Sequence, residues 1–99
     1  MRFRATHLPA VREGSKRMTI RFRDPVQVGP ALLIFDDEVS MPGRVTSTMA
    51  KPVDGITDDE AREDGFASAA DVLPGLRDYY PQLRPSDEIV IVRFEVDGA

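Results

Sequence analysis

A strict alternation of apolar and polar residues from Met18 to Arg23 constrains the fold of this chain more than any other feature. Successive side chains of a β-strand point to opposite faces, so the segment is predicted to be a half-buried strand with Thr19 and Arg21 on its polar face. Residues 89–96, Ile-Val-Ile-Val-Arg-Phe-Glu-Val, show the same period and are apolar at every even-numbered position. We expect this second strand to close a barrel.

Two further strands are predicted between these segments. The run Ala31–Phe35 follows a Gly29-Pro30 break and is apolar on both faces, which is typical of a central strand covered on both sides. Residues 36–43 are predicted to form an acidic loop. Residues 44–50, which are rich in valine and threonine, are predicted to be a strand of weaker pattern.

Local signals predict where the helices begin and end. Residues 7–13 are predicted to form a short helix that ends at Gly14, where a left-handed residue turns the chain. Residues 57–60 have the pattern of a capping box, in which the Thr57 hydroxyl and the Glu60 carboxylate satisfy free backbone N–H groups. This helix should end in a Schellman motif at Gly65.

A second helix in the middle of the chain is predicted after Ser68, which should cap it, and Pro74 should kink it or mark its late start. Strands, then helices, then a closing strand is the order of an α+β fold. A chain of 99 residues is long enough for one hydrophobic core and too short for two. Residues 1–99 are therefore predicted to form a single domain.

Composition excludes several classes of protein. The chain has no cysteine, which rules out disulfides, thiolate catalysis and zinc–thiolate sites and fits a reducing compartment. Its longest apolar run, Ala31–Phe35, is far shorter than the roughly 20 residues of a membrane span. The N-terminus has no apolar signal core, so a soluble, cytoplasmic protein without a membrane partner is expected.

Charge is distributed unevenly along the chain. Residues 1–23 carry seven Lys or Arg against one acid, a net charge of +6, whereas residues 24–99 carry six against sixteen, a net charge of −10. The overall charge of −4 argues against a protein that coats itself in nucleic-acid backbone. A basic segment on an acidic chain would instead draw a small anionic or polar ligand to one place. Surface charge that only keeps the chain soluble is the alternative.

Residues 14–21 read G-x-K-x-x-T-x-R, which resembles the signature of ASCH domains, members of the PUA-like superfamily. Residues 56–68 resemble the middle section of that family, and residues 91–95 resemble its last strand. Three motifs in the right order are more specific than one. The resemblance implies an α+β fold, a small PUA-like β-barrel of about five or six strands with two or three short helices packed against it. It also implies a cleft for RNA or a nucleoside.

Short bacterial members of this family that have Lys and Thr at these positions are similar to the N4-acetylcytidine amidohydrolases, which cleave the acetyl amide from the modified base. The resemblance implies that Thr19 is the nucleophile, Lys16 the base and Asp64 the acid, at a position where these enzymes have glutamate. Aspartate is one methylene shorter, and a misplacement of about 1 Å can cost roughly 100-fold in rate. No cofactor is expected.

The residue types in this motif set conditions on catalysis. A threonine hydroxyl needs a base to remove its proton, and Lys16 can act as that base only when it is neutral. Residues three apart in a regular strand point to opposite faces, so Lys16 and Thr19 would not meet in an uninterrupted strand. A turn or bulge at Gly14 and Ser15 would fold Lys16 over the start of the strand.

Arginines beside the motif are expected to contact the ligand. Arg21 shares a strand face with Thr19, so its guanidinium could grip a carbonyl, phosphate or carboxylate. Pairing of Arg21 with Glu95 or another acid on a neighbouring strand is the alternative. The candidate ligand-binding residues are Gly14, Ser15, Arg17 and Arg21.

Asp64 is unusual for its place in the predicted helix. A carboxylate in the last turn faces the negative end of the helix dipole and loses roughly 0.3–1 kcal/mol, so a compensating partner is expected. We expect Asp64 to face Lys16 or Arg21 across the cleft. An exposed charge on a fraying turn is the alternative.

Other residues are weaker candidates. The adjacent acids at positions 36–38 cannot all face one ion in an extended chain, so no metal site is predicted. His7 is interpreted as a surface residue at the start of a helix. Aromatic residues that could stack on a base, one of which is expected to border the cleft, are Phe3, Tyr79 and Tyr80.

The sequence predicts a nucleoside- or RNA-binding domain and leaves three functions open. The leading hypothesis is a domain that binds a nucleoside or an RNA base in a cationic cleft and removes the acetyl group from N4-acetylcytidine. A non-catalytic RNA-binding module is the first alternative. The second is a ribonuclease, in which Lys16, Thr19 and Arg21 would stabilise a phosphorane. The oligomeric state, monomer or weak dimer, does not follow from the sequence.

Overall fold

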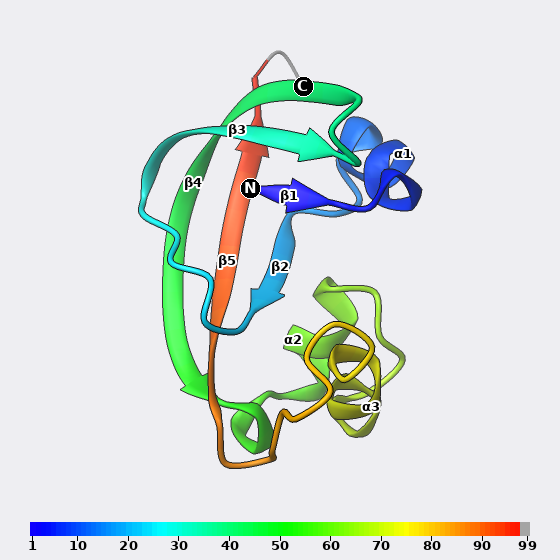
Figure 1. Ribbon diagram of the computed structural model, residues 1–99, viewed down its shortest axis with the longest axis vertical. Coiled ribbons are helices and arrows are strands. Elements are labelled where there is room, and N and C mark those ends of the chain that lie inside the picture. Colours follow the sequence, from blue (N-terminus) through cyan, green and yellow to red (C-terminus); the bar gives the residue numbers. More distant parts are fainter. Residues whose placement is uncertain (98–99) are drawn as a thin grey trace.

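The sheet of this protein is mixed, curled and five-stranded (Figure 1). The computed structural model describes residues 1–97. Neighbouring strands are antiparallel except β1 and β3, and the strand order is β1-β3-β4-β5-β2. The predicted α+β fold with a small barrel-like sheet is therefore confirmed. The strands are β1 (Arg2–Phe3), β2 (Met18–Arg21), β3 (Gly29–Phe35), β4 (Val39–Pro52) and β5 (Glu88–Val96).

Short helical segments pack against this sheet. Within residues 1–97, none of them is long and apolar enough to cross a membrane. The α-helices are α1 (Leu8–Glu13), α2 (Asp58–Glu63) and α3 (Val72–Leu76). The 3₁₀ turns are η1 (Ala5–His7), η2 (Val53–Gly55) and η3 (Ala69–Asp71).

The last strand, β5, lies inside the sheet instead of closing a barrel as expected. It is flanked by β4 on one side and by β2 on the other. Among the described residues, no backbone ladder pairs β1 with β2, so the sheet curls into a half-barrel. The outer edge of β2 is therefore open, and the first residues of the chain and the helical segment α2–α3 approach this edge from its two sides (Figure 1).

The prediction that Ala31–Phe35 forms a central strand covered on both sides is wrong. This run belongs to β3, whose outer neighbour β1 has only two residues. Leu33 and Phe35 are buried, but Leu32 is 49% exposed, so only one face of β3 is fully covered. An apolar run does not show by itself whether its second face meets protein or solvent.

β4 is much longer than the strand predicted at residues 44–50. The expected acidic loop at residues 36–43 is a turn of three residues, 36–38, and β4 follows directly. Asp36 and Asp37 have positive φ angles of 49° and 59°, which aspartate tolerates better than most residues. β4 pairs with β3 through its first half and with β5 through most of its length. It is the strand that joins the two parts of the sheet.

Hydrophobic side chains pack on both faces of β5, with the period of two that the sequence predicts. Ile89 and Ile91 pack with residues of α2 and α3 on one face. Phe94 packs with residues of α1, β1 and β3 on the other. The hydrophobic core therefore has two parts, one covered by α2 and α3 and the other formed with α1, β1 and β3.

α2 begins and ends as the sequence predicts. The Thr57 hydroxyl accepts the Glu60 N–H at 3.2 Å, while the Glu60 carboxylate accepts the Thr57 N–H at 2.9 Å, which completes the capping box. At the other end, the Phe66 N–H donates to the Ala61 carbonyl oxygen at 2.9 Å across Gly65, whose φ is 98°. This is the Schellman motif expected for this helix.

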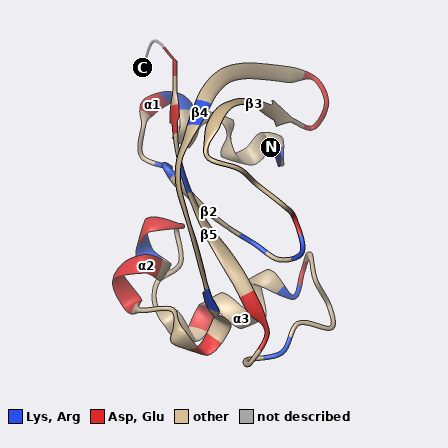
Figure 2. Cartoon of the chain, turned by 90° about the vertical axis from the view of Figure 1, so that its left-hand side faces the viewer, with Lys and Arg blue, Asp and Glu red and all other residues tan. Residues whose placement is uncertain are grey.

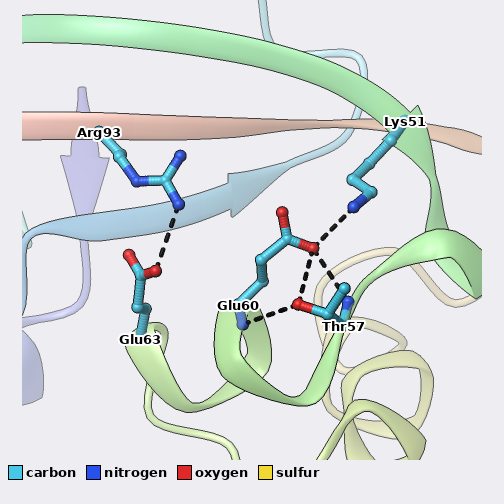
Figure 3. A network of polar contacts seen from close by, with 5 residues as sticks. All are labelled: Lys51, Thr57, Glu60, Glu63 and Arg93. Atoms are coloured by element: carbon cyan, nitrogen blue, oxygen red, sulfur yellow. Dashed lines mark hydrogen bonds and ion pairs between the residues drawn. The ribbon is translucent and has the colours of Figure 1, made fainter.

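Two ion pairs hold α2 against the sheet (Figure 3). Lys51 Nζ on β4 lies 2.7 Å from Glu60 Oε1, and Arg93 Nη2 on β5 lies 3.3 Å from Glu63 Oε1. Both carboxylates come from α2, so the helix is tied to two neighbouring strands. These contacts fix the position of Asp64, the residue that caps the end of α2.

The segment after α2 departs from the prediction in one respect. α3 begins only at Val72, so Pro74 lies in its first turn, where its missing N–H costs nothing. The late start indicated by Pro74 is therefore confirmed. Ser68 does not cap a helix, because its hydroxyl lies 3.3 Å from the Asp71 carboxylate and makes no capping hydrogen bond.

Candidate ligand-binding site

A cavity of about 590 Å³ lies at the open edge of β2. Three parts of the chain form its walls: residues 2–7 with β1 and η1, residues 16–21 with β2, and residues from the ends of α2 and α3. A volume of this size is typical of a site for a small organic ligand. Four of the predicted site residues line it, namely Lys16, Thr19, Arg21 and Asp64.

Lys16 lies before β2, in the connection that leaves α1. Gly14 ends α1 with a left-handed φ of 82°, as the sequence predicts, and the Lys16 N–H then donates to the Ala10 carbonyl oxygen at 3.1 Å. The side chain folds back so that Nζ donates to the Met18 carbonyl oxygen at 3.0 Å. Because Lys16 is outside the strand, alternation does not keep it away from Thr19, and both residues line the same cavity.

The predicted contact between Asp64 and Lys16 is present. Lys16 Nζ lies 2.6 Å from Asp64 Oδ1, and the two side chains are 9% and 10% exposed. Burial raises the pKa of Asp64, and the neighbouring charges of Lys16 and Arg21 offset this only in part. The carboxylate therefore holds a proton more readily than an ordinary aspartate does.

Thr19 is the central residue on the polar face of β2. It pairs with Val92 of β5 and is only 7% exposed, and its side chain lines the cavity. Within residues 1–97, the Thr19 hydroxyl makes no hydrogen bond to protein. A hydroxyl in this position is free to bond to a ligand.

Arg21 crosses the cavity towards the N-terminal segment. Its Nη2 donates to the Arg2 carbonyl oxygen at 2.7 Å, and its guanidinium lies 4.8 Å from the centre of the Phe3 ring. Its partner among the acids is Asp24, at 3.3 Å, and not Glu95, which was named as the alternative partner. The Nε atom of Arg21 is buried and has no hydrogen-bond partner among the described residues. The guanidinium thus joins the two unpaired strands β1 and β2 through side-chain contacts.

The other predicted ligand-binding residues lie outside the cavity lining. The Ser15 hydroxyl donates to the Ala10 carbonyl oxygen at 3.2 Å, and Arg17 Nε donates to the Gly14 carbonyl oxygen at 2.8 Å. Gly14, Ser15 and Arg17 therefore shape the connection between α1 and β2. The structure does not bring them to the residues that line the cavity.

His7 lines the cavity, although the sequence indicated only a surface residue at a helix start. Burial lowers the pKa of His7, and the charges of Lys16, Arg21 and Arg4 lower it further. The imidazole is therefore neutral at pH 7 and can both donate and accept a hydrogen bond. The clustering of basic residues in the first 23 positions was the signal that could have identified this wall of the site.

Aromatic side chains form part of the cavity wall. Phe3, Tyr79 and Tyr80 all line it, which goes further than the expectation that one of them borders it. The Arg4 guanidinium lies 4.4 Å from the centre of the Tyr79 ring. Flat aromatic and guanidinium groups of this kind stack on the faces of bases.

Positive charge predominates around the cavity. Two acids, Asp64 and Asp78, line it together with four basic residues, Arg2, Arg4, Lys16 and Arg21. Acidic residues are concentrated in α2, as Figure 2 shows, and none of the residues of this helix, 58–63, lines the cavity. Within residues 1–97, no group of three or more His, Asp or Glu side chains could hold a metal ion.

The curled half-barrel has the fold of ASCH domains. The structure is similar to an ASCH domain from Lactobacillus crispatus JV V101, with a TM-score of 0.75 and 18% identity over 92% of this chain and 70% of the other. It is also similar to hypothetical protein PH0355, with a TM-score of 0.72 and 16% identity over 97% of this chain and 95% of the other.

A third similar structure is protein EF3133 from Enterococcus faecalis V583, with a TM-score of 0.66 and 18% identity over 88% of this chain and 64% of the other. No protein-family sequence model matches the chain, and no curated protein matches it in sequence. The likeness is therefore one of fold, carried by three-dimensional structure and not by sequence identity.

Proposed function

We propose that the cavity binds a nucleoside or an unpaired base of RNA and hydrolyses an N4-acyl group from cytidine. The observation that carries this proposal is the buried contact of 2.6 Å between Lys16 and Asp64, in the same cavity as the Thr19 hydroxyl. Thr19, Lys16 and Asp64 line this one cavity and are largely shielded from water, which supports roles for them as nucleophile, base and acid. The likeness to an ASCH domain and the resemblance of residues 14–21 to the ASCH signature support the same ligand class.

The surroundings of this contact suit a nucleoside. Tyr79, which is 48% exposed, and Tyr80 supply aromatic surface on which a base can stack, whereas the buried Phe3 ring already stacks with Phe35. The neutral imidazole of His7 and the guanidinium of Arg21 supply polar groups for its edge, its sugar or an attached phosphate. A cavity of about 590 Å³ holds one such ligand and not a folded RNA, so recognition is of a single unit.

The reaction requires Lys16 as a neutral amine and a proton on Asp64. Burial favours the proton on Asp64, because it raises the pKa of that carboxyl. The neutral Lys16 amine then takes the hydroxyl proton of Thr19 as Oγ1 bonds to the acyl carbon. Asp64 gives its proton to the departing N4 nitrogen, and cytidine leaves.

The second half of the reaction removes the acyl group from the protein. Water attacks the acyl carbon of the ester on Thr19 and gives a proton to the Asp64 carboxylate. The bond between the acyl carbon and Thr19 Oγ1 breaks, the Lys16 ammonium returns a proton to Oγ1, and the carboxylic acid is released. Arg21, which lines the same cavity as Thr19, is assigned in this proposal to hold the carbonyl oxygen on which charge develops.

The test is release of cytidine from N4-acetylcytidine by the purified protein. Thr19→Ala should lower kcat at least about 100-fold while ligand binding is kept, because only the nucleophile is lost. Thr19→Ser keeps a hydroxyl and should retain measurable turnover. Thr48→Ala, at an exposed threonine of β4, is the matched control and should have no effect. Turnover by Thr19→Ala at the rate of the unmodified chain would exclude Thr19 as nucleophile.

A non-catalytic RNA-binding role is a second candidate, favoured by the contacts of Lys16. Its Nζ already donates to the Met18 carbonyl oxygen and to Asp64, as expected of a charged ammonium held in place for ligand contact. The same assay separates the two candidates. Binding of N4-acetylcytidine and RNA without cytidine release would support the non-catalytic role, and shortening of a labelled RNA would instead support the ribonuclease alternative.

A further inference from the structure

A second cavity, of about 720 Å³, adjoins the first one. It is formed by the residues that follow β2 and by the segment between α3 and β5, and Tyr80 lines both cavities. Its chemistry is again aromatic and basic. Residues that line this second cavity include Phe22, Arg23, Tyr80, Arg84 and Asp87.

We propose that this second cavity is a subsite for the neighbouring nucleotide of a single-stranded RNA, one base of which occupies the first cavity. The proposal rests on the proposed function, because it extends the same ligand from one nucleotide to at least two. It assigns a binding role to residues 22–23 and 80–87, which take no part in the reaction at Lys16, Thr19 and Asp64.

Tyr80 is the residue that joins the two sites. Its ring centre lies 6.3 Å from that of Tyr79 in the first cavity and 5.6 Å from that of Phe22 in the second. The Tyr79 and Tyr80 rings are tilted by 45°, and the Tyr80 and Phe22 rings meet edge to face at 78°, so the three rings form a stepped row that links the two cavities. Successive bases of a single strand stack on such rows with little regard to sequence, because every base has a π-face.

Two arginines lie beside this aromatic row in the second cavity. The Arg23 guanidinium lies 4.9 Å from the centre of the Phe22 ring, so an aromatic face and a positive charge are presented together. Arg84 lies 3.4 Å from Asp87 through a side chain that is 76% exposed, which is a loose surface pair. The Asp87 carboxylate also accepts the backbone N–H of Arg84 at 2.8 Å, so Arg84 can turn towards a phosphate without leaving Asp87 unbonded.

The backbone conformation of Arg23 is a separate observation that supports a ligand-binding role for this residue. Its φ is +53°, in the left-handed region that residues other than glycine and asparagine seldom adopt. A strained backbone at a position with a long charged side chain is frequent at ligand-binding sites. The turn after β2 thus carries an arginine where a smaller residue would be less strained, and that arginine lies against the cavity.

Charge and shape favour an RNA strand over an acidic peptide. Both ligands would be attracted by Arg23 and Arg84, but a nucleic acid offers a flat base at every unit to the rings of Tyr79, Tyr80 and Phe22. The overall charge of −4 keeps long polyanions from coating the rest of the surface. The strand is therefore expected to follow one path, from the first cavity over Tyr80 to the second.

The experiment compares the affinity of cytidine with that of a tetranucleotide of cytidine by calorimetry or competition. The tetranucleotide should bind at least about 10-fold more tightly than cytidine, since it gains stacking and phosphate contacts. The double variant Arg23→Ala/Arg84→Ala should lose most of this gain and bind cytidine as before. For two lost phosphate contacts, the slope of log K against log salt concentration should fall by about 1.4.

The matched control is Arg12→Ala/Arg44→Ala, which removes two exposed arginines that line neither cavity. This control variant should still bind the tetranucleotide at least about 10-fold more tightly than cytidine. Cytidine binding without any gain for the tetranucleotide would overturn the subsite and leave the proposed function standing. The subsite would also be overturned if the tighter binding of the tetranucleotide survived in Arg23→Ala/Arg84→Ala, or if the control variant lost it to the same extent.

If neither cytidine nor the tetranucleotide bound, the proposed function and this inference would both be wrong. Tighter binding of an acidic peptide than of the tetranucleotide would overturn the RNA subsite and assign the second cavity to a protein partner.

Discussion

Two carboxylates on and beside α2 contact lysines at almost the same distance and yet differ in the direction of their pKa. Lys51 Nζ lies 2.7 Å from Glu60 Oε1, and Lys16 Nζ lies 2.6 Å from Asp64 Oδ1. The hydrogen bond from Lys51, followed by that from the Thr57 backbone, holds the pKa of Glu60 below its ordinary value. Burial raises the pKa of Asp64.

The difference lies in how many donors meet each carboxylate. Glu60 accepts from the Lys51 ammonium and from both the N–H and the hydroxyl of Thr57. Among the described residues, Asp64 accepts a hydrogen bond from Lys16 alone. Donors stabilise the charged form and burial destabilises it, so the balance is opposite at the two positions. The Glu60 carboxylate is therefore stabilised in its charged form, whereas Asp64 holds a proton more readily than an ordinary aspartate does.

The largest expected effect comes from removing each lysine in turn. Lys16→Met leaves the Asp64 carboxylate buried without a partner and should lower the free energy of unfolding by about 3–5 kcal/mol at pH 7. Lys51→Met removes one of three donors from Glu60 and should cost about 1 kcal/mol. Urea unfolding of the two variants at pH 7 measures the difference. Equal losses of unfolding free energy in the two variants would contradict the difference between the Lys16–Asp64 and Lys51–Glu60 pairs.

A smaller effect is expected at the start of α2. Thr57→Ala removes the hydroxyl that caps the helix and should cost about 1 kcal/mol in unfolding free energy. Because the same hydroxyl donates to Glu60, the pKa of Glu60 should move back towards its ordinary value, while that of Asp64 stays raised. Thermal unfolding and carboxyl NMR of the variant check both statements. Ser68→Ala is the control, since Ser68 makes no capping hydrogen bond, and a loss as large as that of Thr57→Ala would contradict the assignment of the caps.

The smallest expected effect is on the dependence of stability on pH. Asp64 binds a proton more tightly in the folded chain, so its contribution is fully present below the unfolded-state pKa and is lost as pH rises through the raised folded value. Glu60 has a lowered folded pKa, so its contribution is present above the unfolded-state pKa and is lost as pH falls through the folded value.

Two variants isolate these contributions. The advantage of the unmodified chain over Asp64→Asn should shrink as pH rises from 3 to 7, and its advantage over Glu60→Gln should grow over the same range. Urea unfolding at several pH values gives both differences. Slopes of the same sign for the two variants would contradict the comparison.

Features that depend on a few neighbouring residues could be predicted from the sequence. The alternation in residues 18–21, the left-handed Gly14 and both ends of α2 follow from local backbone chemistry, and the structure has each of them. The length of β4 and the exposure of Leu32 depend on which strands become neighbours. A run of apolar residues carries no information about that choice, so the predicted covering of β3 was wrong.

The residues of the candidate site also fall into two groups, those that the sequence identified and those that only the strand pairing brings to the cavity. Lys16, Thr19 and Arg21 lie close in sequence, and a resemblance to a known signature singled them out together with Asp64. His7 and Arg4 reach the cavity only because β1 pairs in parallel with β3 and brings the N-terminus beside β2. That pairing joins residues more than 30 positions apart, and no local pattern in residues 1–7 indicates it.

The most direct test of the account is a carboxyl NMR titration of the protein labelled with ¹³C at aspartate and glutamate side chains. The account predicts that Asp64 titrates above 3.8, the ordinary value for aspartate, and Glu60 below 4.5, the ordinary value for glutamate. A pKa of Asp64 below the ordinary value would show a fixed ion pair with Lys16, and the proton exchange on which the proposed reaction depends would then be excluded.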